Sequence, residues 1–79
     1  MSKWKNLNDY ENLRALRFQN AEGFRNGNEA IIADDRLKEI PLEVGPGWML
    51  VIPAPAALFM EKRLRRKGVQ FEVIPVENV

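Results

Sequence analysis

The chain has 79 residues and a formal net charge of +1; 46% of its residues are hydrophobic and 29% are charged. This length fits a single small domain, 1–79, and the composition is that of a globular rather than a disordered chain. The sequence has no cysteine and no histidine. That excludes disulfides, removes the ligands of structural zinc sites, and removes the commonest agents of acid–base and thiol catalysis.

The near-neutral charge gives no global field that would draw the protein to nucleic acid or to a membrane, so electrostatic binding requires local clustering of charge. No apolar run reaches the roughly 20 residues that span a bilayer, and the N-terminal segment lacks the apolar region of a signal peptide. We therefore expect a cytoplasmic protein with no membrane partner, in which residues 1–7 form a flexible tail. A domain this small buries only about 60% of its unfolded surface, which favours association with another protein or a homodimer.

The first half of the chain contains one clear helical pattern and one ambiguous segment. A capping-box pattern at Asn8 and Glu11, followed by apolar residues at helical spacing, predicts a helix over 9–22. Glycine and asparagine dominate 23–28, which predicts turns. The segment 29–40 fits either a helix or a β-hairpin, and we favour the helix because its basic residues lie near the C-terminal end, where they suit the helix dipole.

The second half predicts a strand–helix–strand unit preceded by an edge strand. Residues 40–44 alternate in polarity around a proline, which is typical of an edge strand. The continuous apolar run 48–52 predicts a strand buried on both faces. A helix is expected over 55–67, because prolines are tolerated in a first turn and Gly68 follows its end. The alternation over 69–76 predicts the last strand.

Together these elements predict an α+β (or small α/β) fold. It would have an N-terminal helix, a small mixed sheet of three or four strands, and a C-terminal β-α-β unit whose two strands pair in parallel through a right-handed crossover. A sheet this small does not easily cover both faces of its central strand. This again favours a protein partner or a dimer.

The predicted C-terminal helix carries the candidate binding surface. In helical projection its apolar stripe faces the sheet, whereas Phe59 lies on the charged side with Lys62, Arg63 and Arg66. An aromatic residue among cations suits an acidic and apolar protein surface, or a nucleic-acid backbone with a stacking base. Trp4 joins this surface as a candidate because tryptophan is enriched at interface hot spots. The alternative is a solvated helix face whose cations complement the helix dipole.

Other motifs give weaker signals. Asp34 and Asp35 carry oxygen ligands of the kind that Mg²⁺ prefers, but no ligand motif surrounds them, and we expect no metal site. The turn at residues 45–47 lacks the Lys and Ser/Thr of a phosphate loop, and Trp48 is expected in the core. We therefore expect no catalytic residue, no cofactor and no enzyme activity.

These observations favour a small non-enzymatic protein-interaction module, a subunit, adaptor or inhibitor of a larger assembly that binds through the basic-aromatic helix face. Compact binding proteins of viruses and mobile elements have this character. The alternative is a nucleic-acid-binding protein that uses the same cations on phosphates. The near-neutral charge makes it the weaker hypothesis, because nucleic-acid binders are usually strongly basic.

Overall fold

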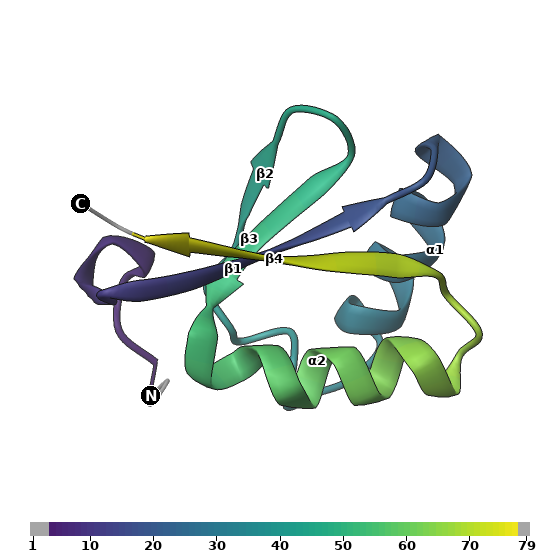
Figure 1. The fold of residues 1–79 in the computed structure, drawn as a ribbon. Coiled ribbons are helices and arrows are strands. Elements are labelled where there is room, and N and C mark those ends of the chain that lie inside the picture. The colour runs from purple at the N-terminus through teal and green to yellow at the C-terminus, as the bar shows by residue number, and fades with distance from the viewer. Residues whose placement is uncertain (1–3, 78–79) are drawn as a thin grey trace.

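The computed structural model describes residues 4–77, in which two helices cover one face of a four-stranded sheet (Figure 1). In chain order the elements are the 3-10 helix η1 (Leu7–Asp9), β1 (Asn12–Phe18), α1 (Ala21–Ile32), β2 (Glu43–Gly45), β3 (Met49–Pro53), α2 (Ala54–Arg66) and β4 (Phe71–Glu77). The strand order is β2-β3-β1-β4, and these pairings are antiparallel. This β-α-β-β-α-β arrangement is the ferredoxin-like, or split β-α-β, topology.

Strand β1 replaces the helix that was predicted over 9–22, so that prediction is wrong. β1 is a central strand that pairs with β3 on one side and β4 on the other. Leu16 and Phe18 point into the core under the helices, and Ala15 points to the opposite face but is also buried. Burial on both faces removes the simple alternation that identifies a strand, and pairing with distant strands outweighs local helical spacing.

Helix α1 occupies the segment 23–28 that was predicted to form turns. Its N-cap is Asn20, whose side-chain Oδ1 accepts a hydrogen bond from the backbone N–H of Gly23 at 2.8 Å. Gly27 lies in the buried face of the helix, directly against the ring of Phe18. Glycine is therefore used here for close helix–sheet approach rather than for a turn.

The segment 29–40 forms neither a continuous helix nor a hairpin. α1 ends at Ile32, and the chain then follows a series of turns through residue 39. Backbone N–H groups of Leu37 and Lys38 both donate to the carbonyl oxygen of Asp34, at 3.0 Å each. Leu37 and Ile40 anchor this loop, because both side chains are buried in the core.

The strand–helix–strand unit β3-α2-β4 is present, but its two strands are not neighbours. β3 and β4 each pair antiparallel with β1, so they run in the same direction with β1 between them. The predicted parallel pair and mixed sheet are therefore wrong, because the prediction had placed a helix where the intervening strand lies. β2 is an edge strand as expected, although it is shorter than 40–44 and begins after Pro41.

The core lies between the sheet and the two helices. From α2 it takes Ala57, Met60 and Leu64, the stripe that the helical spacing predicts. Trp48 does not belong to this core, contrary to expectation: its side chain is 47% exposed and its backbone has a φ of 59° at the end of the β2–β3 turn. Its ring instead lies 6.0 Å from that of Phe24, at the edge of α1.

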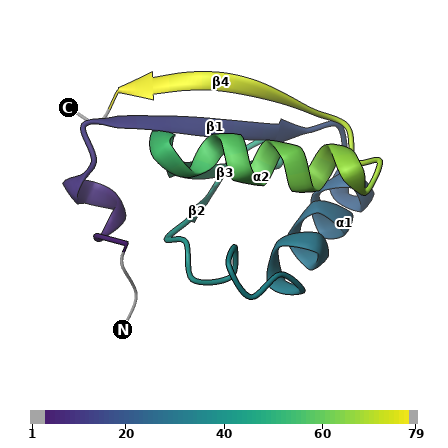
Figure 2. The same cartoon turned by 90° about the horizontal axis from the view of Figure 1, so that it is seen from below.

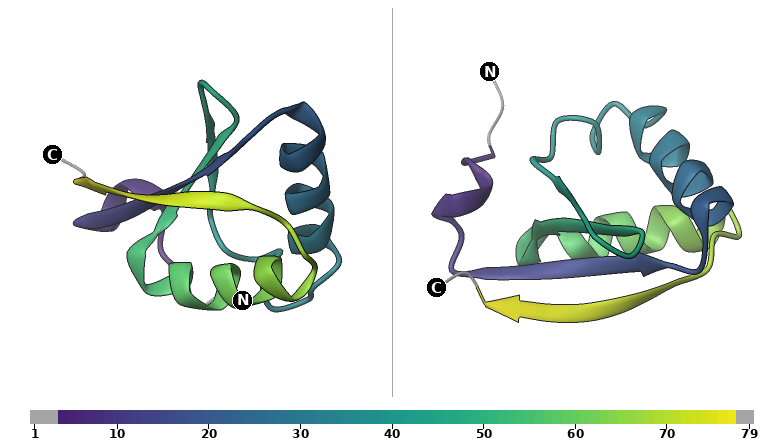
Figure 3. Two further views of the ribbon diagram at one scale, coloured as in Figure 1. Left: turned by 45° about the vertical axis from the view of Figure 1, so that its right-hand side comes forward. Right: turned by 90° about the horizontal axis from the view of Figure 1, so that it is seen from above.

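The second face of the sheet has no helix over it (Figure 2). The register places Ala15 between Val51 and Ile74 on this face, and an ion pair joins Arg17 to Glu72 near its end. Figure 3 shows that η1 lies on the same side of the sheet as the helices, which leaves this second face open. Within residues 4–77, neither helix combines the length and the apolar character that crossing a membrane requires.

Candidate functional site

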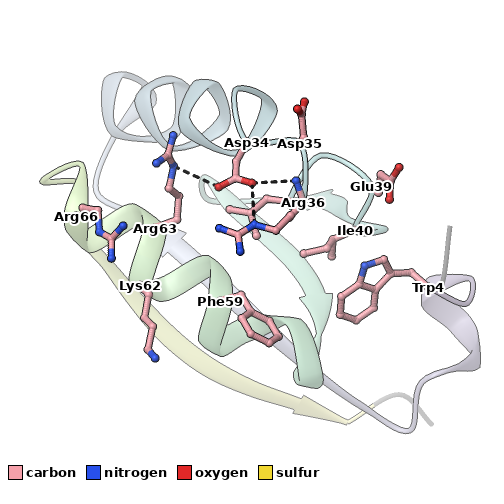
Figure 4. A pocket seen from close by; sticks show the side chains of 11 residues that line it. Trp4, Asp34, Asp35, Arg36, Glu39, Ile40, Phe59, Lys62, Arg63 and Arg66 are labelled. Carbon is pink, nitrogen blue, oxygen red and sulfur yellow. Dashed lines mark hydrogen bonds and ion pairs between the residues drawn. The ribbon is translucent and has the colours of Figure 1, made fainter.

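A groove of about 580 Å³ runs between α2 and the loop of residues 33–40. The five residues proposed from the sequence as a partner-binding surface all line it: Trp4, Phe59, Lys62, Arg63 and Arg66. The sequence pattern had united four of them on one helix face, and the fold adds Trp4 from the other end of the chain. These residues therefore share one site (Figure 4).

The α2 wall of the groove follows from helical geometry. Phe59, Lys62 and Arg66 are spaced by three and four residues, so they lie above one another on one face of the helix. The opposite face is fixed to the sheet by buried apolar side chains. Phe59 is left 58% exposed, the same fraction as its neighbour Leu58, but only Phe59 lines the groove.

Trp4 lies at one end of the groove. Its side chain is partly buried and packs against the core, and its ring centroid is 6.5 Å from that of Tyr10. The backbone N–H of Lys5 donates to the Tyr10 hydroxyl at 3.0 Å. These contacts place part of the segment expected to be a flexible tail, 1–7, against the fold, whereas residues 1–3 lie outside the described residues.

The opposite wall comes from the loop, which the sequence analysis had not assigned to the site. Its lining residues are Asp34, Asp35, Arg36, Leu37, Glu39 and Ile40. The loop brings carboxylates to within reach of the cations on α2. A common turn pattern is an aspartate whose side chain accepts a hydrogen bond from the backbone N–H two residues later. This pattern is the sequence signal that could have predicted an ordered loop here.

Asp34 joins the two walls. Its Oδ1 accepts a hydrogen bond from the backbone N–H of Arg36 at 2.9 Å, and the same oxygen lies 3.9 Å from the Nε of Arg36. Its Oδ2 lies 3.7 Å from the Nε of Arg63. The pKa of Asp34 is lowered, chiefly by the backbone N–H of Arg36, against an opposing effect of burial. The charges of Arg36 and Arg63 and a backbone N–H of Leu37 lower it further. Asp34 therefore stays ionised at neutral pH and ties the loop to α2.

Arg63 and Asp34 are the less exposed of the charged residues in the groove. The Arg63 side chain is 26% exposed and that of Asp34 is 15% exposed. The Nε atom of Arg63 is fully buried and has no hydrogen-bond partner among the described residues. The 3.7 Å ion pair with Asp34 is the main interaction that offsets the cost of burying this N–H group. Arg63 therefore links α2 to the 33–40 loop through Asp34.

The cations of Lys62 and Arg66, by contrast, make no ion pair with any residue between 4 and 77. Arg66 and Lys62 are exposed on the rim, and Figure 4 shows Lys62 pointing away from the loop. Asp35 forms an ion pair within the loop, because its Oδ1 lies 3.1 Å from the Nζ of Lys38. The groove thus offers two uncompensated positive charges on the α2 side.

Asp34 and Asp35 are adjacent in sequence but point in different directions. Asp34 faces the arginines and Asp35 points away from it in Figure 4. Within residues 4–77 no group of three or more acidic side chains is placed to hold a metal ion.

No protein-family model, no curated protein and no solved structure matches this chain. The strand order alone assigns the topology, and a topology shared by many functions does not identify one. What the protein does is therefore inferred from the groove itself.

Proposed function

We propose that the protein is a small interaction module that binds a segment of another protein in the groove between α2 and the 33–40 loop. In this role it is a subunit, adaptor or inhibitor of a larger assembly. One observation carries the proposal: an exposed phenylalanine and a partly buried tryptophan line one groove, and two cations without an ion pair among residues 4–77 lie on its α2 rim. Aromatic and arginine side chains are enriched in the parts of interfaces that contribute most to affinity.

Phe59 supplies the main apolar contact. It is 58% exposed, so a partner that covers it removes roughly 100 Å² of apolar surface from water. At about 25 cal/mol per Å² this contributes roughly 2–3 kcal/mol, which corresponds to a change in Kd of about 30- to 150-fold. Phe59 lines the groove, whereas the equally exposed Leu58 does not, and this position supports a binding role for Phe59.

The alternative of nucleic-acid binding has less support. The formal net charge of the chain is only +1, whereas nucleic-acid binders are usually strongly basic. The open face of the sheet, where sheet-based RNA-binding domains carry stacking aromatics, has none among the described residues. Its Arg17 is already paired with Glu72.

The proposal is tested by affinity capture from the native cell with matched variants. Phe59→Ala combined with Arg66→Glu alters the groove, whereas Leu58→Ala combined with Arg25→Glu makes similar changes on exposed residues outside it. We expect the first variant to lose the captured partner and the second to retain it, with both variants folded by circular dichroism. Retention of the partner by the groove variant contradicts the proposal.

Filter binding with mixed DNA and RNA separates the two functions. A groove that binds protein retains no nucleic acid even at low salt. Retention that falls steeply as salt rises, and that is lost in Arg66→Glu, favours the nucleic-acid alternative instead, because phosphate contacts release counterions.

A further inference from the structure

The geometry points to a partner segment of defined polarity: an apolar anchor at the Trp4 end of the groove, with carboxylates on one side of it only, toward Arg66. This inference rests on the proposed function and specifies the chemistry of the partner. It follows from the way apolar and charged side chains are distributed along the groove.

One end of the groove is apolar. In Figure 4 the rings of Trp4 and Phe59 and the side chain of Ile40 lie together at this end. Ile40 is 4% exposed and forms the floor, whereas the exposed Phe59 ring forms a side. An aliphatic or aromatic side chain of the partner fits between them, and Glu39 stands on the rim above.

The other end is cationic. Lys62 and Arg66 are one helical turn apart, a rise of about 6 Å, and neither has an ion pair among residues 4–77. Arg63 lies between them on the groove side but is already engaged by Asp34. A partner carboxylate can therefore pair with Arg66, bidentately, and a second one with Lys62.

Glu39 makes the two ends inequivalent. No described residue neutralises it in an ion pair, so a carboxylate beside the apolar anchor at this end meets a like charge. A partner placed in the reverse direction would also cover Lys62 and Arg66 with its apolar anchor and leave them desolvated. Both effects disfavour the reverse direction, as like-charge contacts and unpaired buried charges do at specific interfaces.

The spacing of the segment follows from the helix. Phe59 and Arg66 are seven residues apart, about 10 Å along α2, and Phe59 and Lys62 are three residues apart, about 4.5 Å. An extended segment advances about 3.3 Å per residue. The carboxylates are therefore expected within about three residues of the anchor, all on the same side of it.

A display library of random 12-residue peptides, selected on the full chain, tests the inference. Binders are expected to share one apolar residue with Asp or Glu on one side of it. In fluorescence anisotropy, Arg66→Glu should weaken such a peptide at least tenfold, and Arg25→Glu, an equal change of charge on α1, should leave its Kd within twofold. Glu39→Lys should let peptides with carboxylates on both sides of the anchor bind as tightly as the selected ones.

The outcomes separate the inference from the proposed function. The selection could yield binders that need Phe59 but carry carboxylates on both sides of the anchor, or carry basic residues instead. Such binders overturn the inferred direction of the partner segment but leave the groove as a protein-binding site. A selection in which every binder has the same Kd for the wild type and Phe59→Ala, or that yields no binder, overturns the proposed function and the polarity with it.

Discussion

Gly27 is the position where one added methyl group tests the packing of α1 against the sheet most sharply. A Cβ at this residue would lie 2.6 Å from Cε1 and 2.8 Å from Cζ of Phe18. Phe18 is only 2% exposed, and its ring centroid lies 5.8 Å from that of Phe24 and 6.3 Å from that of Phe71. The Phe18 ring cannot move aside without disturbing both of these ring contacts.

The expected effect of Gly27→Ala is the difference between two opposing contributions. Alanine favours the helical backbone over glycine by about 0.5–1 kcal/mol. Overpacking a close-packed core costs about 1–3 kcal/mol. We expect a net loss of about 1–2 kcal/mol in the free energy of unfolding, which lowers the Tm of a domain of this size by roughly 4–16 °C.

Urea unfolding followed by tryptophan fluorescence and circular dichroism measures this loss. Gly23→Ala is the matched control, because it lies in the same helix and its added Cβ comes no closer than 3.4 Å, to the Oδ1 of Asn20. Its free energy of unfolding should equal that of the wild type or exceed it by up to about 1 kcal/mol, because alanine favours the helix and meets no clash there. If Gly27→Ala is as stable as the wild type, or more stable, α1 does not approach Phe18 as described.

Three further substitutions test separate parts of the fold. Asn20→Ala should destabilise the protein by about 1 kcal/mol in chemical denaturation, because it removes the N-cap of α1, whereas Asn20→Asp should be nearly neutral. Leu64→Ala, at a fully buried position, should lower the free energy of unfolding by about 2–5 kcal/mol, and Leu58→Ala, on the exposed side of α2, by less than about 0.5 kcal/mol. Because its pKa is lowered in the fold, Asp34 contributes stability that is present above the ordinary carboxyl pKa of about 4 and is lost as the pH falls through the lowered value. The advantage of the wild type over Asp34→Asn in thermal unfolding should therefore shrink below about pH 4, and an advantage that is independent of pH contradicts the ionised role of Asp34.

Helix α2 could be predicted from the sequence because its signals are local. The spacing of Ala57, Met60 and Leu64 identifies the buried stripe, and all three are buried in the core. Gly68 has a φ of 75°, the left-handed conformation that a glycine after a helix commonly supplies. The exposure of Phe59 and its position among the cations follow from the same projection.

Strand β1 could not be predicted in this way. Its partners β3 and β4 lie far along the chain, and burial on both sides of the strand leaves Leu13, Ala15 and Leu16 without a period of two. The same residues fit a helix about as well as a strand. The error then propagated, because without β1 the strands of the β3-α2-β4 unit had to be paired with each other.

The candidate site was predictable to the extent that it lies on one helix. The loop wall depends on how residues 33–40 fold back onto α2, which no local pattern determines. Trp4 was chosen for its residue type alone, and its position at the end of the groove results from the packing of the N-terminal segment against the core. The Asp34–Arg63 ion pair joins residues almost thirty positions apart and has no sequence signature.

The most direct test of the groove as the binding site is an NMR titration of the ¹⁵N-labelled protein with a selected peptide. The account predicts that the amide shifts change mainly in the 33–40 loop, in α2 from Phe59 to Arg66, and at Trp4. Ala15 and Ile74, on the open face of the sheet, should stay unchanged and serve as the internal reference. Shift changes that cluster on the open face, with the groove amides unmoved, would contradict it.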